Sequence, residues 1–438
     1  MKIQKIIFVL ILTAFSYSEN ISIQKLLEKG TSYQNQGDHK QAIMVFDKII
    51  KLEPSFVQAY LARANSHFSN FNYDKALLDY DKSIEIAPNV IAHKKRAECR
   101  VSLEMYKDAA EDYSYILKSN PNDIKILFTR AECYSSWKLE KYEQAIEDYN
   151  KILTIDPQNI QALFTRAHCY SSDLEQPQQA IQDYTKILEI DPRNIKALAN
   201  RGSIYSLDLE QHKKAIKNYT KILKIEPRNR DALTHRAHCY CRFKNYSKAI
   251  EDYTTAISID TNYLLYAERA GIYFDSKNYQ KAIDDYNQSI KLYPGYAHTH
   301  YYKARCYVYL QQYKKAIKNF SISLSLEPQD DETYRRRGTC YFQLKEYEKA
   351  AKDYEIAIKK SHKNSDLYHD CGDCYYNLKK YNKAVESYSR AIELDSDNTV
   401  ALEGRAKSYE ALGKEVEAKK DYDEIENQSW ELDDEDWD

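Results

Sequence analysis

The feature that most constrains this chain is an internal repeat. The stretch 160–194 predicts two amphipathic helices joined by a turn, because its apolar residues recur at the i, i+3 and i+4 spacing of one helix face. Each helix carries a small residue, Ala167 or Ala180, where two backbones must approach closely. A tyrosine, Tyr170 or Tyr184, follows on the same face. One such hairpin cannot bury both of its faces, so it requires neighbouring copies.

Copies of this hairpin follow one another from residue 23 onward, as twelve units with a period of 33 to 36 residues. Self-similarity of this kind is typical of repeat proteins, whose units stack into a continuous core. A proline closes most of the units, because proline cannot continue a helix. The small residue of the first helix recurs as Gly30, Ala64, Ala97, Ala131, Ala167, Gly202, Ala237, Ala270, Ala304, Gly338, Gly372 and Ala406.

The order small-x-x-Tyr, then Tyr-x-x-Ala-Ile-x-x-Tyr, then Pro resembles the tetratricopeptide repeat, over about residues 23–428. The resemblance implies an all-α fold, a right-handed superhelical solenoid of about twelve tetratricopeptide-like helix hairpins. In this family the first helices line a concave groove that holds peptide or protein ligands. Together with the patterns at the two ends of the chain, which are described below, the repeats predict three segments. These are a signal peptide over 1–18, a repeat array over 19–428 and an acidic tail over 429–438.

Composition limits the class of function. The formal net charge is −2, whereas a nucleic-acid binder normally carries a basic excess. The chain has 9 glycines and no GxGxxG or GxxxxGK[ST] sequence for a phosphate-binding loop. No nucleophile–base pair, paired carboxylate or metal-ligand set stands out, so the sequence predicts no enzyme, no cofactor and no metal site. We expect a protein-interaction scaffold that binds a partner peptide or protein segment, with a chaperone-like holdase or co-chaperone for unfolded clients as the alternative.

The family's ligand-facing positions give a mixed aromatic and polar lining in this chain. Apolar anchors with polar edges suit an extended peptide or a helix. Chaperone-binding relatives use a Lys/Asn/Arg clamp, which is not reproduced here, since the matching positions read Leu61, Asn65, Lys94 and Glu98. The groove candidates for partner binding are Phe68, Phe128, Phe164, His168, His238, Phe274, Tyr301, Arg305, Phe342 and Tyr376.

Seven of the nine cysteines occupy one position of the repeat, which predicts a recurring packing environment for a small apolar side chain. Cys371 and Cys374 match C-x-x-C, but they fall in mid-helix, whereas a redox pair needs a helix N-terminus after a strand. His235 and His238 lie one turn apart without an evident third metal ligand, so we expect solvated side chains. The seven cysteines are Cys99, Cys133, Cys169, Cys239, Cys306, Cys340 and Cys374.

Paired charges recur in most repeats. The residue before the first-helix small position is arginine at Arg63, Arg96, Arg130, Arg166, Arg201, Arg236, Arg269, Arg337 and Arg405. The residue before the second-helix aromatic is aspartate at Asp79, Asp112, Asp148, Asp183, Asp252, Asp285, Asp353 and Asp421. Where the first position is Lys29, Lys303 or Cys371, the second holds Val45, Asn319 or Ser387, and the one mismatch is Arg201 with Asn218. Arginine and aspartate are absent from the same repeats, which predicts that the two side chains are in contact, because a partly buried charge without a partner is costly. The alternative is two independent solvated charges.

The N-terminus has the pattern of a secretory signal. Lys2 and Lys5 precede an apolar run that is too short to span a bilayer, and Ser16 and Ser18 lie at −3 and −1 of a cut before Glu19. We expect a secretory or extracytoplasmic protein without a transmembrane segment in the mature chain. The alternatives are a buried N-terminal capping helix and a cytoplasmic location, which would suit the reduced cysteines.

The acidic tail has six acidic residues in its last eight, together with Trp430 and Trp437. Its composition favours a solvated, disordered end. The alternative is a linear motif that docks on a partner or on the chain's own groove. The sequence leaves the oligomeric state and the identity of the partner open.

Overall fold

The computed structural model describes residues 22–434, and within that range the regular structure is helical throughout. The chain divides into two compact bodies, residues 1–211 and 212–438. The division falls in the turn inside the sixth repeat. The predicted signal peptide, residues 1–18, lies outside the described residues. The all-α solenoid of helix hairpins predicted from the repeat is confirmed.

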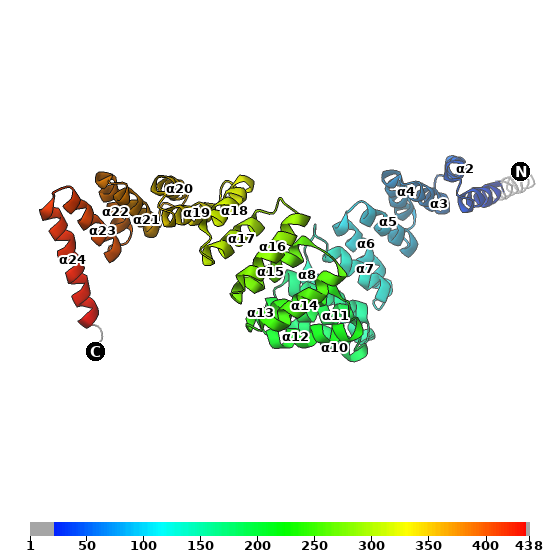
Figure 1. Cartoon of the computed structure of the whole chain (residues 1–438). Helices are drawn as coiled ribbons and strands as arrows, with labels where there is room; N and C mark the ends of the chain where they lie inside the picture. Colours follow the sequence, from blue (N-terminus) through cyan, green and yellow to red (C-terminus); the bar gives the residue numbers. More distant parts are fainter. Residues whose placement is uncertain (1–21, 435–438) are drawn as a thin grey trace, which may run out of the picture. The chain divides into compact units, whose positions relative to one another are not determined.

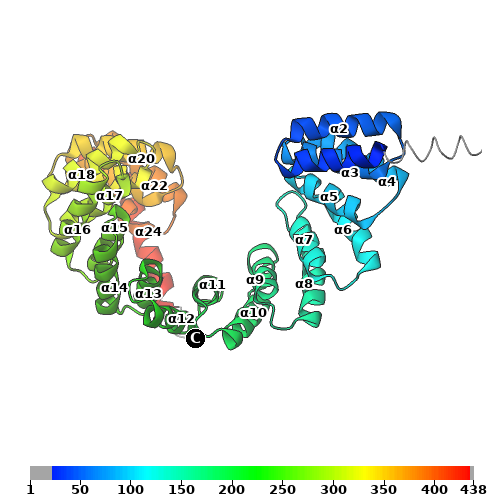
Figure 2. The same cartoon turned by 90° about the vertical axis from the view of Figure 1, so that its right-hand side faces the viewer.

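The first body contains five complete hairpins and the first helix of the sixth. Each helix packs against the next one along the chain, so the hairpins stack in sequence order (blue to green in Figures 1 and 2). After a helix over residues 22–35, the elements are α2 (His39–Leu52), α3 (Val57–Ser69), α4 (Tyr73–Ile86), α5 (Val90–Ser102), α6 (Tyr106–Ser119), α7 (Ile124–Tyr134), α8 (Tyr142–Ile155), α9 (Ile160–His168), η1 (Cys169–Asp173), α10 (Pro177–Ile190) and α11 (Ile195–Leu207).

The second body begins with the second helix of the sixth repeat and contains six complete hairpins. Its helices also pack in chain order (green to red in Figure 1). They are α12 (His212–Ile225), α13 (Arg230–Arg242), α14 (Tyr246–Ile259), α15 (Tyr263–Asp275), α16 (Tyr279–Leu292), α17 (Ala297–Tyr309), α18 (Tyr313–Leu326), α19 (Asp331–Gln343), α20 (Tyr347–Lys360), α21 (Ser365–Asn377), α22 (Tyr381–Leu394), α23 (Thr399–Ala411) and α24 (Glu415–Asp434).

The last helix, α24, is longer than the other second helices. It extends into the predicted acidic tail as far as Asp434, so these tail residues are helical where the sequence predicted a disordered end. The physical reason is the absence of a stop signal, because no glycine or proline follows Gly413.

An asparagine or aspartate side chain caps the N-terminus of most first helices. Asn159 accepts a hydrogen bond from the backbone N–H of Ala162 at 3.0 Å, and Asn229 accepts one from Ala232 at 3.0 Å. Each such cap satisfies an N–H that has no partner inside the helix. Proline and the capping residue together therefore end one repeat and start the next.

The turn inside each hairpin contains a residue with a left-handed backbone. Glycine fills this position only at Gly37 and Gly413, in the first and last repeats, while ten other repeats place a non-glycine residue there with φ between 49° and 61°. The extra residues of the fourth and fifth repeats also lie in this turn. In the fifth repeat they form the π-helical segment η1, because a surface turn accepts an insertion more easily than packed helices do.

The core of each hairpin is an aromatic ring of the second helix lying on the small residue of the first. Tyr184 and Tyr388 are each 1% exposed, and Ala167 is completely buried. A Cβ built on Gly372 would lie 2.7 Å from Cδ1 of Tyr388, so the ring fills the space beside the small position. Neighbouring repeats extend this packing into shared apolar clusters. The small residues are confirmed as points of close helix approach.

We predict opposite effects for two glycine-to-alanine substitutions. Gly404→Ala in α23 should lower the free energy of unfolding by about 1–3 kcal/mol, because its Cβ would lie 2.5 Å from Cζ of Tyr388. Gly271→Ala in α15 should raise it by about 0.5–1 kcal/mol, since no atom lies within 4 Å and alanine favours a helix. Chemical denaturation of both variants tests this, and equal effects would contradict the packing described here.

Candidate functional site

The predicted arginine–aspartate pairs are confirmed in all eight repeats that carry both residues. Each arginine in a first helix donates two hydrogen bonds, from Nε and Nη2, to the two carboxylate oxygens of the aspartate in the second helix. In the seventh repeat, Arg236 donates to Asp252 at 2.9 and 2.7 Å, and the Asp252 side chain is only 5% exposed. Paired bonds of this geometry are among the strongest that side chains make.

The same arginines also reach a third helix, a contact that was not predicted from the sequence. Nη1 donates to a polar side chain on the second helix of the preceding repeat, as in Arg236 to Thr220 at 3.1 Å and Arg337 to Ser321 at 3.0 Å. Each arginine thus joins its own repeat to the previous one, and we call this arrangement the arginine staple. The third partners are Asp47, Asp81, Ser114, Asn150, Thr185, Thr220, Thr254, Ser321 and Ser389.

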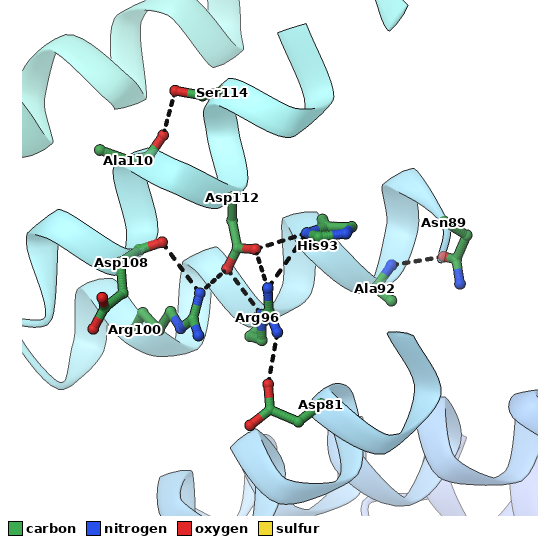
Figure 3. A network of polar contacts seen from close by, with 10 residues as sticks. All are labelled: Asp81, Asn89, Ala92, His93, Arg96, Arg100, Asp108, Ala110, Asp112 and Ser114. Atoms are coloured by element: carbon green, nitrogen blue, oxygen red, sulfur yellow. Dashed lines mark hydrogen bonds and ion pairs between the residues drawn. The ribbon is translucent and has the colours of Figure 1, made fainter. Parts of the chain in front are cut away.

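The third repeat has the densest staple (Figure 3). Asp112 accepts hydrogen bonds from Arg96 and from Arg100, the latter at 2.6 Å from Nη1, and lies 2.7 Å from Nδ1 of His93. Nη1 of Arg96 reaches Asp81 on the preceding second helix at 2.7 Å. Two carboxylates therefore face two guanidinium groups, which keeps the buried charges balanced.

Repeats without the pair depart from the staple in an orderly way. In the ninth repeat Lys303 replaces arginine and Asn319 replaces aspartate. Asn319 donates to the backbone oxygen of Lys315 at 2.8 Å. Burial and the nearby Lys318 lower the pKa of Lys303. In the sixth repeat Arg201 keeps the contact with the preceding repeat, through a bond from Nη1 to Thr185 at 2.9 Å.

The predicted groove aromatics are half-buried and pack against the second helix of their own repeat. One group closes the hairpin against the first residue of that helix, with ring centroids 5.3 to 5.6 Å apart: Phe68 with Tyr73, Phe274 with Tyr279, Phe342 with Tyr347 and Tyr376 with Tyr381. The other lies on the core ring, at 5.5 to 5.8 Å: Phe128 with Tyr149, Phe164 with Tyr184 and Tyr301 with Phe320. His168 and His238 are exposed.

Three of these ten residues form one cluster. The guanidinium carbon of Arg305 lies 4.8 Å from the ring centroid of Phe274 and 5.7 Å from that of Tyr301. Tyr302 completes the aromatic surroundings at 5.0 Å. Nε of Arg305 is buried and donates no hydrogen bond to any described residue. The cluster therefore contains a cation that is held by rings and retains a free donor.

Four cavities in the second body lie between the first helices of neighbouring repeats. Between α13 and α15 a cavity of about 340 Å³ includes His238, and between α15 and α17 one of about 230 Å³ includes Phe274. Between α17 and α19 one of about 310 Å³ includes Arg305, and between α21 and α23 one of about 270 Å³ includes Tyr376. Each cavity thus contains one of the predicted groove residues.

The cavity between α17 and α19 is the most basic of the four. Arg335 and Arg336 line it together with Arg305, and neither is among the groove residues predicted from the sequence. Nε of Arg336 donates to the Tyr301 hydroxyl at 3.0 Å, and Glu332 lies 2.7 Å from both Arg335 and Arg336. The three consecutive arginines at 335–337 were the available signal, of which only the last belongs to a staple.

The cysteines and histidines lie where the sequence predicted. All seven recurring thiols are buried, and burial raises the pKa of Cys133 to about 12. Cys371 and Cys374 lie in the interior of α21, away from its ends. His235 and His238 are exposed, and His235 stacks on Tyr219 with ring centroids 5.5 Å apart.

Comparison with known proteins identifies the family. Profiles of the tetratricopeptide repeat match residues 27–91, 124–159, 160–194, 195–229, 231–263, 264–296, 332–364 and 365–398. The chain belongs to the tetratricopeptide repeat family, a class of protein-interaction scaffolds. No curated protein matches the chain.

Solved structures with similar folds are distant in sequence. The C-terminal part of a tetratricopeptide repeat protein from Cytophaga hutchinsonii is 20% identical, with a TM-score of 0.48, over 54% of this chain and 96% of that one. MamA from Desulfovibrio magneticus is 16% identical, with a TM-score of 0.38, over 39% of this chain and 97% of that one. Yeast Tom70 is 17% identical, with a TM-score of 0.33, over 86% and 92%. Similarity at this distance identifies no partner.

The length and hydropathy of the helices bear on whether any of them could cross a membrane. Among residues 22–434, none of the helices combines the length and the apolar character that crossing a bilayer requires.

We predict that Arg236 and Asp252 are energetically coupled. Arg236→Met should lower the stability of the seventh repeat by about 3–5 kcal/mol, because it leaves a buried carboxylate without its cation. Combination with Asp252→Asn should cost less than the sum, with a coupling energy of about 1–3 kcal/mol. Native-state hydrogen exchange of α13 and α14 measures the stability of this repeat locally.

The matched control is Arg242→Met on the same helix, where the side chain is exposed. This substitution should change stability by less than about 0.5 kcal/mol. Additive effects of the Arg236 and Asp252 substitutions would contradict the coupling.

Proposed function

We propose that this protein binds an extended segment of a partner protein along the first helices of its second body and catalyses no reaction on it. The observation that carries the proposal is a row of three cavities between consecutive first helices from α13 to α19, with a fourth between α21 and α23, each with one groove residue. An extended peptide fits such a row, because its alternate side chains can enter successive cavities while its backbone crosses the helices.

The basic cavity between α17 and α19 indicates the chemistry of the segment. Arg305, Arg335 and Arg336 supply three positive charges, and Glu332 supplies one negative charge beside them. A glutamate, aspartate or phosphate group on the ligand would balance the excess by accepting hydrogen bonds from these guanidinium groups. Phe274 and Tyr302 provide apolar surface for a neighbouring side chain.

The alternative is a holdase for unfolded clients. The half-buried aromatic residues along the first helices would suit it, because exposed apolar segments of many sequences could pack on them. The two functions differ in selectivity, since the basic cavity discriminates by charge and an aromatic lining does not.

Selection of displayed random peptides on the full chain tests the proposal. We expect the enriched peptides to share an acidic residue next to an apolar one, and Arg305→Gln to weaken their binding at least about tenfold. Arg228→Gln, which changes an exposed arginine in the turn before α13, should leave the affinity unchanged. Peptides without a shared acidic position, combined with suppression of aggregation of denatured proteins, would favour the holdase.

We also propose that the protein is exported. The basic residues and the apolar run at the N-terminus support this, and so does the chemistry of the thiols. Eight of the nine cysteines are buried, and burial raises the pKa of Cys340 and Cys371 to about 12. Such thiols resist oxidation, because only the thiolate reacts, so reduced cysteines are compatible with an oxidising compartment.

Mass spectrometry of the protein from its own cells tests export. We expect the mature chain to begin at Glu19. A chain that retains Met1 would contradict the proposal and favour a cytoplasmic location.

A further inference from the structure

The arginine staple has its fullest seat in the eighth and tenth repeats, where the arginine lies between two tyrosines. In the tenth repeat, Arg337 lies between Tyr334 and Tyr341, with ring centroids 5.5 and 5.9 Å from its guanidinium carbon. Its polar bonds go to Asp353 on the same repeat and to Ser321 on the preceding one. The seat thus consists of two tyrosine walls and two acceptor positions.

The eleventh repeat keeps the seat and lacks the arginine. Tyr368 and Tyr375 occupy the positions of the two tyrosine walls, while Cys371 replaces the arginine and Ser387 replaces the aspartate. A cavity of about 750 Å³, larger than each of the four described above, opens at this place and is lined by all four residues. The small side chain of Cys371 therefore leaves unfilled the volume that an arginine occupies elsewhere.

An acidic residue stands at the seat of the eleventh repeat. The position that accepts from Nη1 in the other repeats is here Glu355, on α20, and no other repeat has glutamate there. Glu355 lines the cavity and accepts a hydrogen bond from the hydroxyl of Tyr375. In the eleventh repeat the carboxylate available to a guanidinium is therefore that of Glu355 on the preceding second helix. In the tenth repeat it is that of Asp353 on the repeat's own second helix.

The other charged residues that line the cavity are Lys359, Lys383, Glu386, Arg390 and Glu393. Arg390 bonds to Glu393 at 2.5 Å, with about half of its side chain exposed. The ammonium of Lys383 lies 5.1 Å from the centroid of Tyr375, a contact that Lys349 makes with Tyr341 at 5.5 Å beside the filled seat of the tenth repeat. Since lysine and arginine occur together in the tenth repeat, Lys383 does not take the place of the missing guanidinium.

We propose that this cavity, the vacant arginine seat of the eleventh repeat, binds the side chain of an arginine presented by a partner polypeptide. The guanidinium stacks between Tyr368 and Tyr375 and donates to Glu355, as Arg337 of the tenth repeat lies between Tyr334 and Tyr341 and donates to Ser321. Guanidinium suits the seat better than ammonium, because it is planar, stacks on rings and donates in a fork. None of the residues involved belongs to the predicted groove, so the site is independent of the proposed groove function.

Ligand-observed NMR of the full chain with Nα-acetyl-L-arginine amide tests the inference. We expect saturation transfer to the arginine side chain and an affinity at least about tenfold higher than that of the citrulline analogue, which has the same shape without the charge. The lysine analogue should bind more weakly than the arginine analogue. Equal binding of all three compounds, or no binding, would overturn the proposal.

Two variants locate the binding. The double substitution Cys371→Arg with Ser387→Asp should rebuild the staple, abolish binding of the arginine analogue and raise the melting temperature. Glu355→Gln should weaken binding at least about fivefold with little change in the fold, while Glu348→Gln on the exposed face of the same helix should change nothing. Unchanged binding to the rebuilt double variant would overturn the site, whatever the result for groove peptides.

Discussion

The arrangement of this chain depends on a guanidinium group that three helices share. An arginine of one first helix bonds to a buried aspartate of its own second helix and to a polar side chain of the previous repeat, as Arg236 does with Asp252 and Thr220. Apolar burial favours any close approach of two hairpins, since it has no direction. The staple adds direction, because its paired bonds form at only one relative position of the three helices.

The exceptions to the staple follow from the cost of an unpaired buried charge. Lys303 faces Asn319 and Cys371 faces Ser387, so neither repeat retains an aspartate without its arginine. Removal of one partner is more costly than removal of both. Loss of the pair in the eleventh repeat nevertheless leaves the tyrosine walls in place, and the result is a cavity rather than a collapsed core, because the rings are held by other contacts such as that of Tyr375 with Glu355.

Each first helix places its staple residue and its cavity-lining residue on opposite sides. Successive residues of an α-helix are rotated by about 100°, so residues two apart point to nearly opposite sides. Arg236 belongs to a staple and His238 lines a cavity, and the two are related in this way. The groove side can therefore change in charge and shape, as it does at Arg305, while the staple side keeps the repeats in register.

Sequence alone determined the fold class, the repeat boundaries, the buried thiols and the pairing of arginine with aspartate, because each recurs at a fixed spacing and repetition reveals local physics. It did not reveal the bond to the preceding repeat, although a polar residue two positions after each aspartate was visible, nor the cluster of Arg305 with Phe274 and Tyr302. These contacts join different repeats, so they depend on how one hairpin is placed against the next. Only the tertiary structure decided which side chains share a cavity. The distance between repeats is set by how they pack, and the sequence of a single repeat does not contain it.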